Sequence, residues 1–292
     1  MFADACRSAS EYTRPVVTSI RRRDGGVSAE VGSFIVLNSD GWILTAGHVF
    51  DSLVRYQGDM KKAEEIEEIN RSRESRPGSP SGQIKMDPSF LSNHSFWWGW
   101  DSVRLNNVTV NRQLDIAVGR LEPFVPGMVS GFPVLADPDD VRVGSALCRG
   151  GFCFPQLHVE WDDAKSAFKI NGIPQASIFF NDCLLSRSVD NGPAIDKRYR
   201  LSYIETSTPG IKGQSGGPIF DPEGRMWAMQ VSTRSIELGF QPTALNDGRT
   251  VVENQFMNIG VGLHVATVRR FLDDLDVRYD AEGDDSGYRI IG

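Results

Sequence analysis

The sequence predicts an all-β protein, because short apolar and β-branched runs alternate with Gly, Pro, Asn and Asp turn signals along most of the chain. The clearest case is the pair of runs at residues 31–37 and 42–45, which Asn-Ser-Asp-Gly joins as a hairpin. Two stretches instead have helical periodicity, one at 59–70 and one at 265–275. With 292 residues, the chain is long enough for one large domain or two small ones.

The first half of the chain predicts a sheet that an insertion interrupts. After a loose lead-in at residues 1–13, strands are expected at 15–20, 31–37, 42–45, 108–110 and 116–118, and a short helix at 49–54.

The insertion is expected at about residues 55–105. Its helix at 59–70 precedes a Ser-, Arg-, Pro- and Gly-rich stretch, 71–82, that we expect to be mobile. The aromatic cluster at 96–100 either packs the insertion onto the sheet or offers a binding platform. The large burial energy of aromatic rings favours packing.

Breakers at Pro123, Pro126 and Gly127 separate the two halves of the chain. The second half predicts strands at 141–147, 158–160, 167–170, 176–180, 201–206, 218–220, 226–233 and 251–263. The terminal helix at 265–275 places its apolar residues on one face. An acidic tail, 276–292, follows and is expected to be disordered or peripheral.

Composition excludes several classes of function. The net charge of −7 gives nucleic-acid binding no electrostatic support. No apolar run approaches the roughly 20 residues that span a bilayer. The first residues, Met-Phe-Ala-Asp-Ala-Cys-Arg, lack the pattern of a signal peptide. We therefore expect no membrane association and a cytoplasmic location.

The four cysteines, Cys6, Cys148, Cys153 and Cys183, are irregularly spaced, which favours thiols over a disulfide framework, although Cys148 and Cys153 could meet across a hairpin. No Cys/His cluster has zinc-site spacing, so no metal and no cofactor is expected. His94, His158 and His264 have no visible acid or serine partner in the sequence and are expected to be structural.

The stretch Lys-Gly-Gln-Ser-Gly-Gly-Pro at 212–218 has the pattern of an exposed nucleophile. Gly213 permits a tight turn that aims the amides of Gly213 and Ser215 at one point, where an oxyanion would develop. Taken alone, the stretch fits a glycine-rich surface turn equally well. A serine nucleophile needs a base to take its proton, and the base needs an acid to orient it. The chain supplies candidates for both, since His48 follows an apolar run and Asp115 precedes one, and this favours the catalytic interpretation.

These residues carry a resemblance to a known family. Through residues 32–36, 41–48, 115–118, 213–218 and 260–263, the chain resembles the chymotrypsin-fold, or trypsin-like, serine peptidases. It is most similar to the bacterial branch that contains HtrA-type proteases and glutamyl endopeptidases. The resemblance covers about residues 14–275 and includes the chain order His, Asp, Ser that chymotrypsin has.

The resemblance implies two packed antiparallel six-stranded β-barrels, at residues 14–125 and 126–275, with the terminal helix closing the second. It implies a serine endopeptidase in which Ser215 attacks a peptide carbonyl, His48 moves the proton and Asp115 orients the imidazole. No PDZ domain is expected after the terminal helix, which departs from HtrA-type proteases.

The resemblance also places a substrate pocket. Its floor would come from Thr208, Pro209, Gly210 and Ile211, one wall from Gln230, Val231, Ser232 and Thr233, and another from Gly260 and Gly262. The floor lacks an acid, which argues against a preference for Arg or Lys. Gln230 occupies the position where glutamyl endopeptidases have a histidine that reads glutamate, so an acid preference is not secured. A small-to-medium apolar residue before the cleaved bond is the expectation.

Activation is expected to differ from that of digestive trypsins, which have an Asp just before the serine that pairs with a new N-terminus. Gln214 carries no charge, so the resemblance implies activity without N-terminal processing. Three alternatives stay open. The same acyl chemistry would serve an esterase, the domain could be a catalytically silent peptide-binding module, or a regulatory protein partner or the insertion could gate it.

Overall fold

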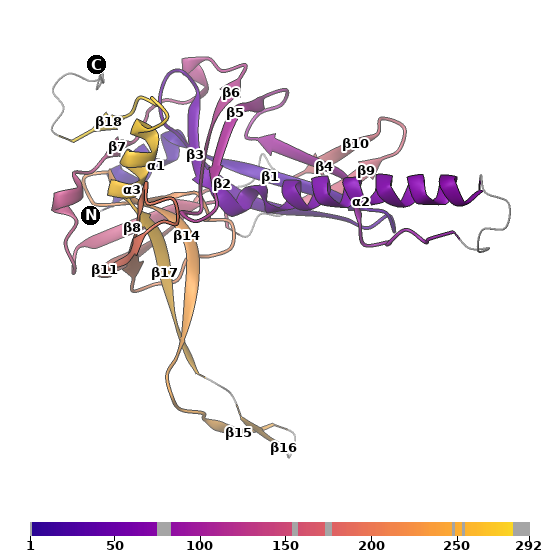
Figure 1. The fold of residues 1–292 in the computed structure, drawn as a ribbon. Helices are drawn as coiled ribbons and strands as arrows, with labels where there is room; N and C mark the ends of the chain where they lie inside the picture. The colour runs from indigo at the N-terminus through magenta and orange to yellow at the C-terminus, as the bar shows by residue number, and fades with distance from the viewer. Residues whose placement is uncertain are drawn as a thin grey trace.

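The computed structural model describes residues 2–74, 83–153, 157–172, 177–246, 249–252 and 255–282. Two antiparallel sheets, one from each half of the chain, form the body of the molecule (Figure 1). This architecture confirms the predicted all-β, chymotrypsin-like fold of two barrels with a C-terminal helix.

The first sheet is six-stranded and has the order β4-β1-β2-β3-β6-β5. Its strands are β1 (Thr13–Arg22), β2 (Val27–Val36), β3 (Trp42–Ala46), β4 (Leu91–Trp98), β5 (Arg104–Asn111) and β6 (Ile116–Glu122). The predicted hairpin joins β2 to β3, where Asn38 Oδ1 accepts the amide of Asp40 at 3.0 Å. The 3-10 helix η1 (Gly47–Phe50) follows β3 directly.

The second sheet closes on itself. Six strands, β13-β8-β11-β12-β17-β14, form a ring that the pairing of β13 with β14 completes, and the short strands β7 and β18 add in parallel beside β14. The strands are β7 (Val134–Leu135), β8 (Ala146–Gly151), β11 (Phe179–Pro193), β12 (Arg200–Thr206), β13 (Pro218–Phe220), β14 (Arg225–Glu237), β17 (Phe256–His264) and β18 (Asp280–Ala281).

Two hairpins lie outside the sheets. One is β9 (His158–Asp162) with β10 (Ala167–Asn171), and the other is β15 (Thr243–Asn246) with β16 (Arg249–Val252). The second hairpin lies at the end of a long ribbon formed by β14 and β17 (Figure 1).

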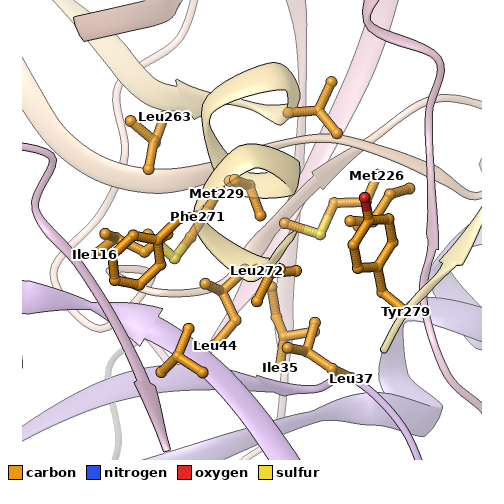
Figure 2. Packing of buried hydrophobic residues seen from close by; sticks show 14 of the residues in the cluster. Ile35, Leu37, Leu44, Ile116, Met226, Met229, Leu263, Phe271, Leu272 and Tyr279 are labelled. Carbon is orange, nitrogen blue, oxygen red and sulfur yellow. The ribbon is translucent and has the colours of Figure 1, made fainter. Parts of the chain in front are cut away.

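A hydrophobic cluster joins the two barrels (Figure 2). Ile35, Leu44 and Ile116 come from the first sheet, and Met229 and Leu263 come from the second. The helix α3 (Val265–Asp273) covers the cluster with Phe271 and Leu272. Because interiors are close-packed, this shared core fixes the ends of β3 and β6 relative to the second barrel, and those ends lead into the candidate catalytic residues.

Three predictions about helices are corrected. Residues 3–12 form the helix α1 (Ala3–Tyr12) rather than a loose lead-in, and its Ala5, Ala9 and Tyr12 are buried in the shared core. The short helix predicted at 49–54 and the helix predicted at 59–70 are one continuous helix, α2 (Asp51–Glu74). It projects beside β4 (Figure 1), and the buried carboxylate of Asp59 accepts the amide of Leu91 at 3.0 Å.

The segment 55–105 is not wholly an insertion, since it contains β4 and the start of β5. The aromatic cluster lies on and after β4, where Trp98 packs edge-on against Phe34 of β2, with ring centroids 5.6 Å apart. Residues 75–82 of the predicted mobile stretch are outside the described residues.

The start of the acidic tail is also corrected. Val277 and Tyr279 are buried, and Glu282 pairs with Arg225, with the Oε1 and Nη1 atoms 2.5 Å apart. Residues 283–292 lie outside the described residues. Among the helices that the structure describes, none has the length and apolar character required to cross a bilayer.

Candidate active site

His48 and Asp115 form a two-point contact at the ends of neighbouring strands. β3 pairs with β6 so that Ala46 faces Ile116, which places the residues after β3 beside the residue before β6. Asp115 Oδ1 accepts the backbone amide of His48 at 2.7 Å, and Oδ2 lies 2.8 Å from His48 Nδ1. With Nδ1 as the donor, Nε2 is left as a proton acceptor.

The backbone around this pair is specialised. Asp115 has a φ of +55°, a left-handed conformation that Asp and Asn tolerate better than other residues with a side chain. Gly47 makes room for the carboxylate, because a Cβ there would lie 3.2 Å from Asp115 Oδ1 and 3.1 Å from the amide nitrogen of Ile116. The contact is therefore built into the ends of the strands as well as into the side chains.

Ser215 is bound to the first barrel through Ser33 of β2. The amide of Ser33 donates to the carbonyl oxygen of Ser215 at 2.8 Å, and the Ser33 hydroxyl donates to the carbonyl oxygen of Gly213 at 2.7 Å. Glycine is required at 216, where φ is +84° and a Cβ would overlap the carbonyl oxygen of Ser33. The nucleophile loop is thus clamped at the seam between the barrels.

The amides of Gly213 and Ser215 take no part in the hydrogen bonds that the described residues of this loop form. Gln214, between them, donates its amide to Ile211 O at 2.9 Å. In the hydrogen bonds of the described residues, neither Gly213 N nor Ser215 N donates to a protein acceptor. Gly213 has a φ of +101°, and a Cβ there would overlap the carbonyl oxygen of Phe152. Two free N–H groups separated by one residue are a suitable pair for an oxyanion.

Gln214 is fully buried, and its side chain forms two hydrogen bonds that hold the loop in place. Its Nε2 donates to Asn181 Oδ1 at 2.7 Å, and its Oε1 accepts the amide of Ile211 at 2.9 Å. Both ends of this neutral side chain are satisfied by nearby residues of the second barrel. No ammonium group is needed to complete these contacts.

Ser215 and His48 line one cavity of about 260 Å³, together with Gly213, Gly32 and Val49. Among the hydrogen bonds of the described residues, none joins Ser215 Oγ to His48. Catalytic hydrogen bonds are often long in unliganded sites and shorten when a substrate binds. In the structure, Asp115 therefore contacts His48, and His48 shares a cavity with Ser215.

A second cavity, of about 560 Å³, adjoins the first, and Glu30, Val31, Lys212 and Gly213 line both. Val27–Val31 of β2 and residues 157–159 before and within β9 line the rest. Lys212 Nζ pairs with Glu30 Oε1 at 3.0 Å, between two exposed side chains. A groove that leads away from Ser215 along the edge of β2 can hold an extended chain.

The predicted pocket residues also lie together. Gly260 donates its amide to Thr208 O at 2.9 Å, and Thr233 Oγ1 donates to Gly210 O at 2.7 Å. Thr233 pairs with Gly260 across β14 and β17, while Gln230 pairs with Gly262. Pro209, Ile211, Val231 and Ser232 lie within the same two stretches. Gln230 is only 2% exposed, and a Cβ on Gly210 would overlap its Nε2, so the Gln230 side chain fills the space beside Gly210.

Two features of the site were missed by sequence reasoning. Ser33 lay in a matched motif, but nothing local indicated that its hydroxyl would brace a loop 180 positions away. Arg149 ends fully buried beside Thr206 and Gly260, although it reads as an ordinary strand residue. Only the register of β8 in the closed barrel places it there.

The other histidines have partners that the sequence did not reveal. His94 Nε2 lies 3.0 Å from Ser52 Oγ, and His158 Nε2 lies 3.0 Å from Glu160 Oε1. His264 caps α3, because its Nδ1 accepts the amide of Ala266 at 3.0 Å.

The four cysteines are free thiols, and Cys6 and Cys148 have their Sγ atoms 3.8 Å apart. Across the described parts of the chain, no group of three or more His, Cys, Asp and Glu is arranged to hold a metal ion.

Comparisons with known proteins show a family match and a shared fold. The model of the trypsin-like peptidase domain family matches residues 32–229. Among solved structures, the active form of the Rv3671c protease from M. tuberculosis superposes with a TM-score of 0.50 at 12% identity, over 94% of this chain and 86% of that one. The HtrA-type protease AlgW, with a tripeptide, gives 0.50 at 13% identity, over 94% of this chain and 63% of AlgW.

At these identities the two structures indicate a shared fold and no more. This chain spans about two thirds of the length of AlgW. The comparison with curated protein sequences gave no match.

Proposed function

The chain belongs to the trypsin-like peptidase domain family, and from this premise we propose that it is a serine endopeptidase that works through His48, Asp115, Ser215 and an acyl-enzyme. The observation that carries the proposal is the two-point contact of Asp115 with His48, at 2.7 and 2.8 Å. That contact leaves Nε2 free as a base, in a cavity that Ser215 also lines.

In the proposed reaction, Ser215 Oγ attacks the peptide carbonyl carbon while His48 Nε2 takes the hydroxyl proton. The amides of Gly213 and Ser215 bind the oxyanion, each worth about 3–4 kcal/mol if they resemble a measured oxyanion donor. His48 then gives the proton to the leaving amine as the C–N bond breaks, which leaves the acyl group on Ser215 Oγ. A water molecule, deprotonated by His48, attacks this ester, and the proton returns to Ser215 Oγ as the carboxylic acid product leaves. Asp115 stabilises the imidazolium throughout.

The experiment is cleavage of a mixture of defined peptides, read by mass spectrometry. The full chain should produce new peptide ends that Ser215→Ala and His48→Ala do not produce. An ester substrate run in parallel addresses the esterase alternative. Hydrolysis of esters with every peptide left intact would contradict the endopeptidase proposal.

A second candidate is a catalytically silent or partner-gated domain that binds peptides in the same groove. It is favoured by the missing hydrogen bond between Ser215 and His48 and by the closed space around Gln230. A regulatory protein partner or the segment 55–105 would then open the site. Trimming residues 75–82 tests one form of gating, and unchanged cleavage of every substrate would count against it.

A further inference from the structure

Arg149 carries a charged side chain that is sealed inside the second barrel. It lies on β8 opposite Asn181 of β11 and Ile219 of β13, and its exposed fraction is 0%. An arginine keeps its proton inside a protein. A buried charge is ordinarily paired with an opposite one, because leaving water without compensation is costly.

Arg149 has only neutral partners among the described residues. Its Nη2 donates to Thr206 Oγ1 and lies 3.5 Å from Cys183 Sγ. Its Nε and Nη1 have no hydrogen-bond partner, and none of the described ion pairs includes Arg149.

The carboxylate next to Thr206 in sequence is that of Glu205, and it is already engaged. Arg187 binds its Oε2, and Arg234 Nη1 lies 2.9 Å from its Oε1. Among the described residues, Arg149 is therefore left with unused donors and no anionic partner.

The guanidinium lies beside Gly260, one of the residues that the resemblance places around a substrate pocket. A Cβ on Gly260 would overlap Arg149 Nη1 and lie 2.6 Å from Nη2. Thr206 Oγ1, which Arg149 contacts, lies 3.2 Å from Gly260 O and 3.1 Å from Thr208 O, and its single proton can be donated to either. The guanidinium group of Arg149 thus contacts Gly260, and its partner Thr206 contacts Thr208, the first residue of the predicted pocket floor.

Gln230 closes the pocket from the other wall. A Cβ on Gly210 would overlap the Gln230 amide, whose Nε2 donates to Ser232 O at 2.6 Å. Gln230 Oε1 is buried and has no hydrogen-bond partner in the part of the chain that the structure describes. Since one end of this amide is unsatisfied, it can be displaced at little cost in hydrogen bonding. Side-chain rotations of this kind are common when a ligand binds.

We propose that Arg149 is the base of the substrate pocket and that it selects peptides with Asp or Glu before the cleaved bond. This inference rests on the proposed function and names its substrate class. The entering side chain displaces the Gln230 amide, and its carboxylate accepts a charge-assisted hydrogen bond from Arg149 Nη1, which is unpartnered among the described residues. This preference for Asp or Glu differs from the apolar preference that the sequence predicts.

The test measures binding separately from catalysis. Full-length Ser215→Ala protein is titrated with fluorescent peptides in pairs that differ only in Glu against Gln, or Asp against Asn, at the selected position. The acidic peptide should bind about 30-fold or more tightly, the scale of a buried charge pair. Arg149→Met in the same background should remove the difference. Arg187→Gln, which also removes one positive charge, should retain it.

Equal affinity for the two members of each pair in the Ser215→Ala protein overturns the inference, and so does a preference that survives Arg149→Met. If Arg149→Met fails to fold, the inference is judged by whether Ser215→Ala binds the acidic peptide of each pair more tightly than the neutral one. Labelling of Ser215 in the unmodified chain is read independently. An unlabelled serine with tight acidic-peptide binding refutes the proposed function alone, whereas a labelled serine with no acid preference refutes the pocket assignment alone.

Discussion

Asp115 holds His48 by two atoms at once, with Oδ1 on the backbone amide at 2.7 Å and Oδ2 on ring Nδ1 at 2.8 Å. We expect Asp115→Asn to retain the fold, because Asn tolerates the φ of +55° as well as Asp does. Without the carboxylate, His48 would no longer be held in the tautomer that leaves Nε2 as the proton acceptor, and no negative charge would stabilise the imidazolium. The kcat should therefore fall by about 10⁴-fold, as the same substitution does in a known triad. Steady-state kinetics with a thermal melt tests this, and a loss below about tenfold, far short of that figure, would contradict the role of Asp115.

Ser33 of the first barrel should hold the loop of Ser215 in its active conformation, because its hydroxyl donates to Gly213 O. Ser33→Ala removes the hydroxyl that donates to Gly213 O and accepts the amide of Phe152. The free energy of unfolding should fall by about 1–3 kcal/mol, because a buried carbonyl and amide lose a partner. In addition, kcat should fall, because Gly213 is one of the two proposed oxyanion donors.

Ser19→Ala is the matched control for Ser33→Ala. Ser19 is equally buried on β1, but its hydroxyl has no hydrogen-bond partner among the residues that the structure describes. Its removal should therefore leave both stability and kcat close to those of the original protein. Urea unfolding and kinetics on the two variants give the comparison. Identical behaviour of the two would show that the Ser33 hydroxyl does not brace the loop.

The intact chain should be active without cleavage near its N-terminus. Gln214 is tied by Asn181 and by the amide of Ile211, so the loop does not depend on a new terminal ammonium. Active-site titration combined with intact-mass measurement checks this on one sample. Protein that stays inert until it is cut near residue 14 would refute it. Gln214→Leu should lower kcat, since Asn181 Oδ1 and the amide of Ile211 lose the hydrogen bonds that they form with Gln214.

Stability should fall in mild acid through His94. Burial lowers the pKa of His94 to about 4, below its ordinary value of 6.5. Between pH 6.5 and 4 the unfolded chain binds a proton that the folded chain does not, so the contribution is complete above pH 6.5 and is lost on acidification. The loss is at most about 3 kcal/mol.

His94→Gln should flatten the pH dependence of unfolding in that window, relative to the unsubstituted chain. Burial also lowers the pKa of His264, which contributes with the same sign in both proteins and cancels in the comparison. His158→Gln is the control, because His158 is exposed beside Glu160. A pH profile that His94→Gln leaves unchanged would contradict the assignment.

The sequence was sufficient for those parts of the site that depend on local pattern. His48 follows β3, Asp115 precedes β6, and the glycines around Ser215 occupy backbone conformations that a side chain would obstruct. Many of the strands and the terminal helix followed from turn signals and periodicity, whereas β4 was not predicted as a strand.

What the sequence could not supply depends on closure of the barrels. The contact between Ser33 and Gly213 and the position of Arg149 beside Gly260 each join strands that are distant in the chain. The continuous helix α2 was read as two helices because its apolar pattern is weak, and α1 was missed because its packing partners lie in the second half of the chain. Tertiary contacts decide such elements more than local propensity does.

The most direct measurement is covalent labelling of Ser215 with a fluorophosphonate probe, with the site located by peptide mass spectrometry. The account predicts one label per folded chain, at Ser215, and labelling in His48→Ala that is slower by about 10³-fold or more, since the base is lost. Folded protein that leaves Ser215 unlabelled, or that labels equally fast without His48, would contradict it.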